Sequence, residues 1–271
     1  MKKILSTGVS IVLSALLLFP ILNVFTFSLM SDAEIMYFQE VEETLHLIPL
    51  EIKFEGYFNL LFATNNYLRL FWNSMLITSA CAVANILNSI LLSYIFVHLN
   101  FKGRKFLIWV FIYTMLLPYQ ATMLPNYLLT KYVNLHNTWW AVILPMSFSP
   151  MTAILLIPFQ IQIETDTIDA ALLDTKSLVK ILHYIVVPYI KPGIICTFII
   201  TFAEGWNMVE QPLIMLIDKS LWPLSVALSS QLKPYSTILF SGALLYMMPI
   251  VLLYLMFKED FLCMIGEIVA K

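Results

Sequence analysis

Charged residues are scarce in this chain of 271 residues. Only 12% of the residues are charged and 60% are hydrophobic, whereas an ordinary soluble protein has about 25% charged and about 45–50% apolar residues. So few polar groups cannot cover a water-facing surface, which excludes an ordinary soluble protein and makes lipid the expected solvent. The net charge of −2 excludes a dominant basic surface, so no nucleic-acid partner is expected.

Cysteines and catalytic motifs are also scarce. Cys81, Cys196 and Cys263 lie far apart, which predicts buried thiols and neither a disulfide framework nor a CxxC metal site. The four histidines are scattered, whereas metal sites need clustered ligands: His46, His98, His136 and His183. The sequence has no Walker GxxxxGK[ST], HExxH or GxSxG motif, so it predicts no bond-breaking chemistry in this chain.

Six apolar stretches are long enough for membrane helices, which need about 20 apolar residues each. They cover residues 8–30, 71–97, 106–129, 139–161, 183–203 and 238–257. The first is longer than the roughly 7–15 apolar residues of a signal peptide, so it is interpreted as a retained span. Because a segment in hydrocarbon must satisfy its own backbone hydrogen bonds, the expected fold class is an all-α integral membrane protein, with residues 1–271 forming one domain.

Lysine and arginine predict the orientation of these spans. With the N-terminus inside, ten of the 15 basic residues lie in cytoplasmic segments, so the positive-inside rule favours two cytoplasmic termini. The tryptophans placed outside would suit an interfacial aromatic belt: Trp72, Trp139, Trp140, Trp206 and Trp222. The outer loop of residues 31–70 is acidic, and it is interpreted either as solvated or as a contact for an external partner. Its carboxylates are Asp32, Glu34, Glu40, Glu42, Glu43, Glu51 and Glu55.

The loop of residues 163–182, between spans four and five, combines charges with apolar side chains at helical spacing. A charge at the centre of a membrane helix costs about 2.5–3.5 kcal/mol, so this loop is predicted to form two amphipathic helices in the cytoplasm. Ser177 is expected to cap the second helix. Ala170 and Ala171 lack bulk and would let another protein approach the backbone. Periodicity alone leaves two interpretations open, a docking element and a helix on the lipid surface.

The sequence DAALLDTKS at residues 169–177 resembles the EAA loop of permeases in binding-protein-dependent ABC importers. Pro188 follows Asp174 by fourteen residues, the spacing found in the carbohydrate branch of that family. Further segments resemble this branch in the same order along the chain: residues 101–105, 116–129, 134–145, 191–192, 202–213 and 241–266. The chain is therefore identified as similar to carbohydrate importer permeases over nearly its whole length.

The resemblance implies partners and roles. Such a permease pairs with a second, related permease on two cytoplasmic ATPase subunits, and an extracellular solute-binding protein delivers the solute. The chain would then lie in a prokaryotic plasma membrane and need no cofactor of its own, since the partner ATPase uses ATP and Mg. The EAA loop couples the permease to the ATPase, and its residues here are Asp169, Ala170, Ala171, Asp174 and Ser177. Thr175 replaces the usual glycine, and a β-branched residue resists positive φ, so the local turn is expected to differ.

Polar residues within the spans are candidates for the solute pathway, with hydrogen bonding between helices as the alternative. Asn85 and Asn88 lie about one turn apart on span two, and both interpretations stay open. Gln120 lies between two prolines that would break a straight helix. Trp206 would either stack on a sugar or anchor the protein at the membrane surface. A polar cluster at the outer end of span five meets solute or binding protein, or is simply solvated: Glu204, Asn207 and Glu210.

Two functions of other classes compete with the importer. An ion-coupled secondary transporter would need acidic residues or broken half-helices as ion sites, and the middles of the six spans have essentially no acidic residues. A membrane scaffold that no longer transports is the second alternative, because the coupling loop departs from the family pattern. Co-purification with an ATPase distinguishes the importer from the secondary transporter.

Overall fold

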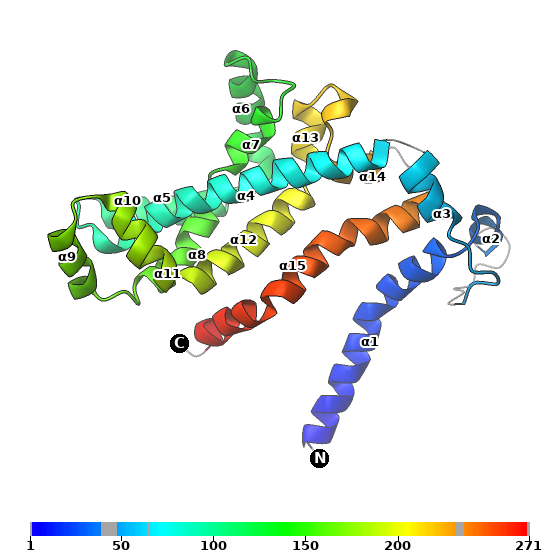
Figure 1. Ribbon diagram of the computed structural model, residues 1–271, viewed down its shortest axis with the longest axis horizontal. Helices are drawn as coiled ribbons and strands as arrows, with labels where there is room; N and C mark the ends of the chain where they lie inside the picture. Colours follow the sequence, from blue (N-terminus) through cyan, green and yellow to red (C-terminus); the bar gives the residue numbers. More distant parts are fainter. Residues whose placement is uncertain (1, 39–47, 64–65, 231–235, 270–271) are drawn as a thin grey trace. The chain divides into compact units, whose positions relative to one another are not determined.

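The computed structural model describes residues 2–38, 48–63, 66–230 and 236–269. Within these ranges all regular structure is helical and no strand occurs, which confirms the all-α fold class (Figure 1). Four residues named in the sequence analysis lie outside the described residues, Glu40, Glu42, Glu43 and His46, as do two of the 15 basic residues, Lys233 and Lys271. The side chain of Cys263 also lies outside them, whereas Cys81 and Cys196 are buried and form no disulfide among the described residues, as predicted.

The chain forms two compact units, Met1–Phe71 with Val226–Pro249, and Trp72–Ser225 with Ile250–Lys271. The helices that begin in the first unit are α1 (Lys2–Ser28), α2 (Asp32–Tyr37), α3 (Glu55–Phe58), α4 (Asn66–His98) and α15 (Thr237–Val269). The helices of the second unit are α5 (Arg104–Met115), α6 (Tyr119–Tyr132), α7 (Trp140–Met146), α8 (Pro150–Gln160), α9 (Thr165–Asp174), α10 (Leu178–Ile181), α11 (Val187–Tyr189), α12 (Lys191–Trp206) and α13 (Glu210–Met215). The helix α14 (Leu224–Ser230) crosses the boundary between the units.

Three helical segments are long and apolar enough to cross a membrane unbroken: Thr7–Ser28, Asn66–His98 and Thr237–Glu259. Three further candidates are bent pairs, α5 with α6 at 99°, α7 with α8 at 40°, and Leu178–Tyr189 with α12 at 86°. Length and composition therefore allow six spans if each pair is one span. The predicted spans 106–129, 139–161 and 183–203 each contain one of these breaks, of which the sequence predicted only the one near Gln120.

Proline lies at the start of the second helix in each bent pair. Pro118 is the N-cap of α6, Pro150 begins α8, and Pro192 lies in the first turn of α12. A proline in the first turn sacrifices no hydrogen bond, since that N–H has no partner within the helix. Ser149, just before Pro150, is extended with φ −125° and ψ 120°, as expected of a residue that precedes proline. The expected break near Gln120 is thus confirmed.

The core of the second unit lies where α4, α8, α9 and α12 meet. Ile86, Ile90 and Tyr94 of α4 contribute to one buried cluster with Leu156 of α8 and Ile168 of α9. Two glycines of α12 allow this helix to lie close to α8 and α4. A Cβ on Gly193 would lie 2.6 Å from the Phe159 ring, and one on Gly205 would lie 3.2 Å from the Thr78 methyl group. These contacts pack α12 closely against α8 and α4.

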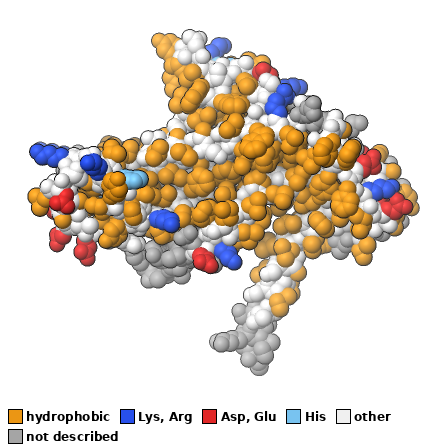
Figure 2. Space-filling view, in the orientation of Figure 1, with side chains coloured by type: hydrophobic (Ala, Val, Ile, Leu, Met, Phe, Trp, Pro, Cys, Tyr) orange, Lys and Arg blue, Asp and Glu red, His pale blue; other side chains and the backbone are white. Residues whose placement is uncertain are grey.

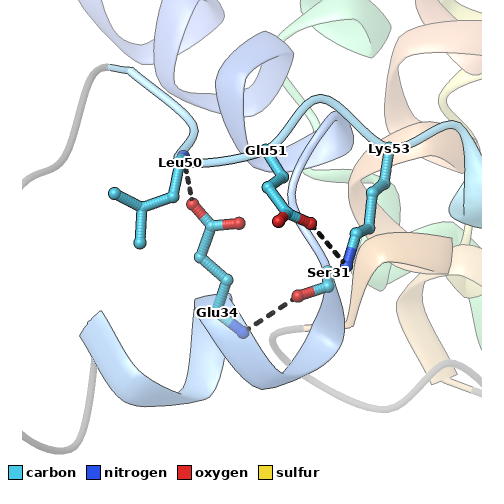
Figure 3. Close-up of polar contacts among 5 residues, drawn as sticks. All are labelled: Ser31, Glu34, Leu50, Glu51 and Lys53. Atoms are coloured by element: carbon cyan, nitrogen blue, oxygen red, sulfur yellow. Dashed lines mark hydrogen bonds and ion pairs between the residues drawn. The ribbon is translucent and has the colours of Figure 1, made fainter.

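In the first unit, the described part of the acidic loop is folded. Met30, Ile35 and Phe38 form a small buried core with Phe27 and Phe240. Three polar contacts order the surrounding backbone (Figure 3). The Glu34 amide donates to Ser31 Oγ at 3.3 Å, the Leu50 amide donates to Glu34 Oε1 at 2.7 Å, and Lys53 pairs with Glu51 at 3.1 Å.

Asp32 anchors the start of α15 in the first unit. Its Oδ1 accepts hydrogen bonds from both the amide and the hydroxyl of Thr237, each at 2.7 Å. We expect Asp32→Ala to lower stability by about 0.5–2 kcal/mol, the usual cost of losing a helix cap. The measurement is thermal unfolding of the purified chain in detergent. Asp32→Asn, which keeps an oxygen acceptor, is the matched control, and equal midpoints for both variants and the parent would contradict the capping role.

Candidate functional site

The helix α9 is amphipathic and is held against the core by one face. It begins after Glu164, whose carbonyl accepts from the Thr167 amide at 3.1 Å, and Asp166 in the first turn complements the positive end of the helix dipole. Ile168 and Ala171, one turn apart, are buried in the core cluster. The predicted amphipathic helix is therefore present, and the core of the second unit fixes its position through this face.

The opposite face of α9 is exposed. Asp169, Ala170 and Asp174 all lie on it, and the side chain of Leu173 is 90% exposed. Figure 2 shows charged side chains gathered at the end of the second unit that holds α9 and α10. The two alanines of the predicted docking set thus differ, because Ala170 is free to meet another surface and Ala171 packs inside this chain. Leu173 was missed in the sequence, although its i, i+4 spacing from Asp169 could have placed it on this face.

The turn after α9 forms without positive φ. Thr175 is extended, with φ −150° and ψ 138°, and its hydroxyl accepts a hydrogen bond from the Ser177 amide at 3.2 Å. Ser177 occupies the N-cap position of α10 as predicted, but its side chain makes no capping hydrogen bond. Its carbonyl accepts from the amides of Lys180 and Ile181. The threonine side chain therefore stabilises a turn of its own where the family has glycine.

A cavity of about 1060 Å³ lies within the second unit. Its wall includes the break between α5 and α6 at Leu117 and the break between α7 and α8 at Ser149. The end of α12 and the start of α13 complete the wall with Glu204, Asn207 and Glu210. Interrupted helices therefore surround the cavity, and their ends bring polar groups to it.

Asn85 and Asn88 hold the broken pair α7–α8 against α4. The Asn85 amide donates to the Met146 carbonyl at 3.1 Å, and the Asn88 amide donates to the Ser147 carbonyl at 2.8 Å. These carbonyls lie at the end of α7, where no further helical turn supplies a donor. Asn85 Oδ1 also accepts from Ser89 at 3.1 Å and Thr152 at 2.5 Å. Both residues therefore bond between helices, and Asn85 also lines the cavity.

The other predicted pathway residues are Gln120, Glu210 and Asn207, which lie at or near the cavity, and Trp206, which is buried. Gln120 donates to Glu210 at 3.2 Å and so connects α6 to α13. Asn207 lines the cavity and donates back to the Ala203 carbonyl of its own helix at 2.8 Å. The predictions for Trp206 are wrong in this structure, because its side chain is 0% exposed and its ring stacks on Phe202 at 5.6 Å. A fully buried ring offers no face to a sugar or to lipid.

Among the cavity residues that the sequence analysis missed, two are buried and polar. Thr201 and Gln211 line the cavity and are each 1% exposed. The Gln211 amide nitrogen lies 3.3 Å from both the Ala141 and the Val142 carbonyls. Gln211 directly follows Glu210 and precedes Pro212, and polarity within an apolar region was the available signal. Of the described residues, no group of three or more His, Cys, Asp or Glu side chains could hold a metal ion.

Loss of the Asn85 network is expected to destabilise the protein. Asn85→Ala would remove one donor and one acceptor from buried groups, at a cost of about 1–3 kcal/mol. Asn88→Ala is the comparison, since Asn88 is only half-buried and makes one such bond. Thermal unfolding in detergent, monitored by size-exclusion chromatography, should give a lower midpoint temperature for Asn85→Ala than for Asn88→Ala. A midpoint equal to that of the parent would show that the network adds no stability.

Broken apolar helices around a largely apolar cavity with a few polar groups, together with an anchored amphipathic helix, are typical of a multi-span membrane transport protein. The particular family follows from comparison with known families. The chain belongs to the binding-protein-dependent transport system inner membrane component family, whose model matches residues 85–259. The resemblance recognised in the sequence is confirmed.

Individual relatives agree with this assignment. The arabinooligosaccharides transport system permease protein AraQ of Bacillus subtilis is 28% identical over 253 residues, which cover 92% of this chain and 89% of the relative. The sn-glycerol-3-phosphate transport system permease protein UgpE of Brucella melitensis is 25% identical over 250 residues, covering 88% and 87%. A chain from the crystal structure of a bacterial ABC transporter involved in import of the acidic polysaccharide alginate has the same fold, with a TM-score of 0.81, 18% identity and 95% coverage of both chains.

Proposed function

We propose that this chain is one permease half of an ATP-driven importer for a carbohydrate. It forms half of the translocation pathway and pairs with a second, related permease. Two cytoplasmic ATPase subunits hydrolyse ATP with Mg, and an extracellular binding protein delivers the solute. Family membership supports the importer class, and the names of relatives such as AraQ support a sugar as solute.

The observation that carries the coupling role is the two-faced packing of α9. Ile168 and Ala171 join α9 to the same core cluster as α4, α8 and α12, while Asp169, Ala170 and Leu173 face outward. A partner that moves the exposed face therefore moves the spans behind it, because packed interiors transmit displacement. In this proposal the ATPase binds that exposed face.

Both termini lie in the cytoplasm in this proposal. The excess of lysine and arginine on the same side as the 163–182 loop supports the orientation. The exposed carboxylates and lysines of that loop also favour an aqueous location, since burial of an unpaired charge in hydrocarbon is costly.

Arginine at the exposed face of α9 should uncouple transport. We expect Ala170→Arg or Asp169→Arg to reduce ATP-driven solute uptake in cells to background, because a bulky cation would block close approach of the ATPase. Val179→Arg adds the same group at an exposed position of α10, outside the docking face, and should retain most uptake. Membrane levels of each variant, measured by immunoblotting, must match the parent. Uptake that survives both α9 substitutions would refute docking at this face.

Affinity purification in mild detergent tests the assembly. A second permease and an ATPase should be recovered with the tagged chain, and Ala170→Arg should lose the ATPase but retain the second permease. A homo-oligomer without ATPase, even after crosslinking, would favour an ion-coupled secondary transporter. Recovery of the full assembly without ATP-driven uptake would favour a scaffold instead.

A further inference from the structure

The charged residues of the cavity wall all have one sign. Glu204 and Glu210 line the cavity, and its lining includes no lysine, arginine or histidine among the described residues. Both glutamates are exposed. A cavity lined by one sign of charge within low-dielectric walls concentrates its field, so it attracts cations and repels anions.

Oxygen atoms without hydrogen-bond partners lie in the same wall. Thr201 Oγ1 and Gln211 Oε1 are buried and have no partner among the described residues, and both residues line the cavity. A threonine within a helix usually satisfies its hydroxyl with a carbonyl of the preceding turn. Thr197, one turn earlier on α12, does so, because its hydroxyl donates to the Gly193 carbonyl at 2.7 Å. An unsatisfied buried polar atom is costly. Gln211 Oε1 can only accept a hydrogen bond, whereas the Thr201 hydroxyl can donate or accept one, so the two atoms together suit a ligand with hydroxyl groups.

We propose that this cavity contains a subsite for a neutral, polyhydroxylated solute and that Glu204 and Glu210 exclude solutes with negative charge. The proposal rests on the proposed function and specifies its solute class. Sugar hydroxyls donate to the two carboxylates, to Gln211 Oε1 and to Thr201 Oγ1. A phosphate or uronate group would instead face two carboxylates with no cation to balance it.

Family membership alone does not show whether the solute is neutral or anionic. The name of one relative specifies a neutral type of sugar, the arabinooligosaccharides, and that of another specifies glycerol-3-phosphate, which is anionic. The transporter with the same fold is involved in the import of alginate, an acidic polysaccharide. For this chain, the preference for a neutral solute over an anionic one is therefore inferred from the residues of the cavity wall.

Charged thiol reagents measure the sign of the potential without a known solute. Thr114 is exposed and lines the cavity, so Thr114→Cys is introduced in the full chain after replacement of Cys81, Cys196 and Cys263 by alanine. Rates are measured in membranes with the trimethylammonium-ethyl and the sulfonatoethyl methanethiosulfonate reagents. Each rate is divided by the rate of the same reagent with 2-mercaptoethanol, and Asn126→Cys provides a second position on the wall.

We expect the normalised rate to be about tenfold higher for the cationic reagent than for the anionic one, within the range for focused fields. Combining Glu204→Gln with Glu210→Gln should bring the ratio close to one. Glu164→Gln removes an exposed carboxylate outside the cavity lining and should leave the ratio unchanged. A ratio at or below one in the parent, or no reaction at either position, would overturn the proposal.

The solute itself provides the second measurement. Mass spectrometry of the compound released from the binding protein of the purified importer should identify a neutral sugar. A compound with a phosphate or carboxylate group would overturn the charge assignment and leave the importer function intact. Conversely, the cationic reagent could react tenfold faster while affinity purification of the tagged chain recovers no ATPase. This result would refute the importer function and support the negatively charged cavity.

Discussion

The rest of the structure depends on how the backbone groups freed by helix breaks find partners. In apolar surroundings an unpaired carbonyl costs several kcal/mol, and a break in a span exposes several of them. Here α4 is continuous from Asn66 to His98, and it donates the side-chain amides of Asn85 and Asn88 to the freed carbonyls at the end of α7. One unbroken helix thus allows its neighbour to break, and the broken ends then become part of the cavity wall.

The same packing connects the cavity to α9. At one end of α12, Cys196 belongs to the core cluster and Gly193 lies against Phe159 of that cluster. Farther along the same helix, Thr201 and Glu204 line the cavity. From Gly193 to Glu204 is eleven residues, or about 16 Å at the rise of an α-helix. In the proposed importer, a displacement of α9 would reach Thr201 and Glu204 through α12, because close packing transmits displacement.

Composition and local motifs made the helical fold and the coupling segment predictable, because both depend on local periodicity and charge. The ends of the bent pairs were only partly predictable. Pro118 marked one break, but the 86° bend at Ile190 lies between Pro188 and Pro192, and neither proline by itself shows which of the two interrupts the helix. The site was harder to predict, since hydropathy does not distinguish an inward from an outward ring at Trp206. Its burial follows from contact with Phe202.

Thr175 shows that the turn after α9 forms without glycine and without positive φ. Glycine at such a turn is favoured where positive φ is needed, but a turn with φ −150° needs no glycine. A threonine hydroxyl can then supply an acceptor that glycine lacks, and here it bonds the Ser177 amide. Because Ile168, Ala171 and Ile181 on both sides of the turn are anchored in one core cluster, the orientation of α9 is determined by this packing. The substitution at Thr175 is therefore compatible with an α9 that still presents Asp169 and Ala170 to a partner.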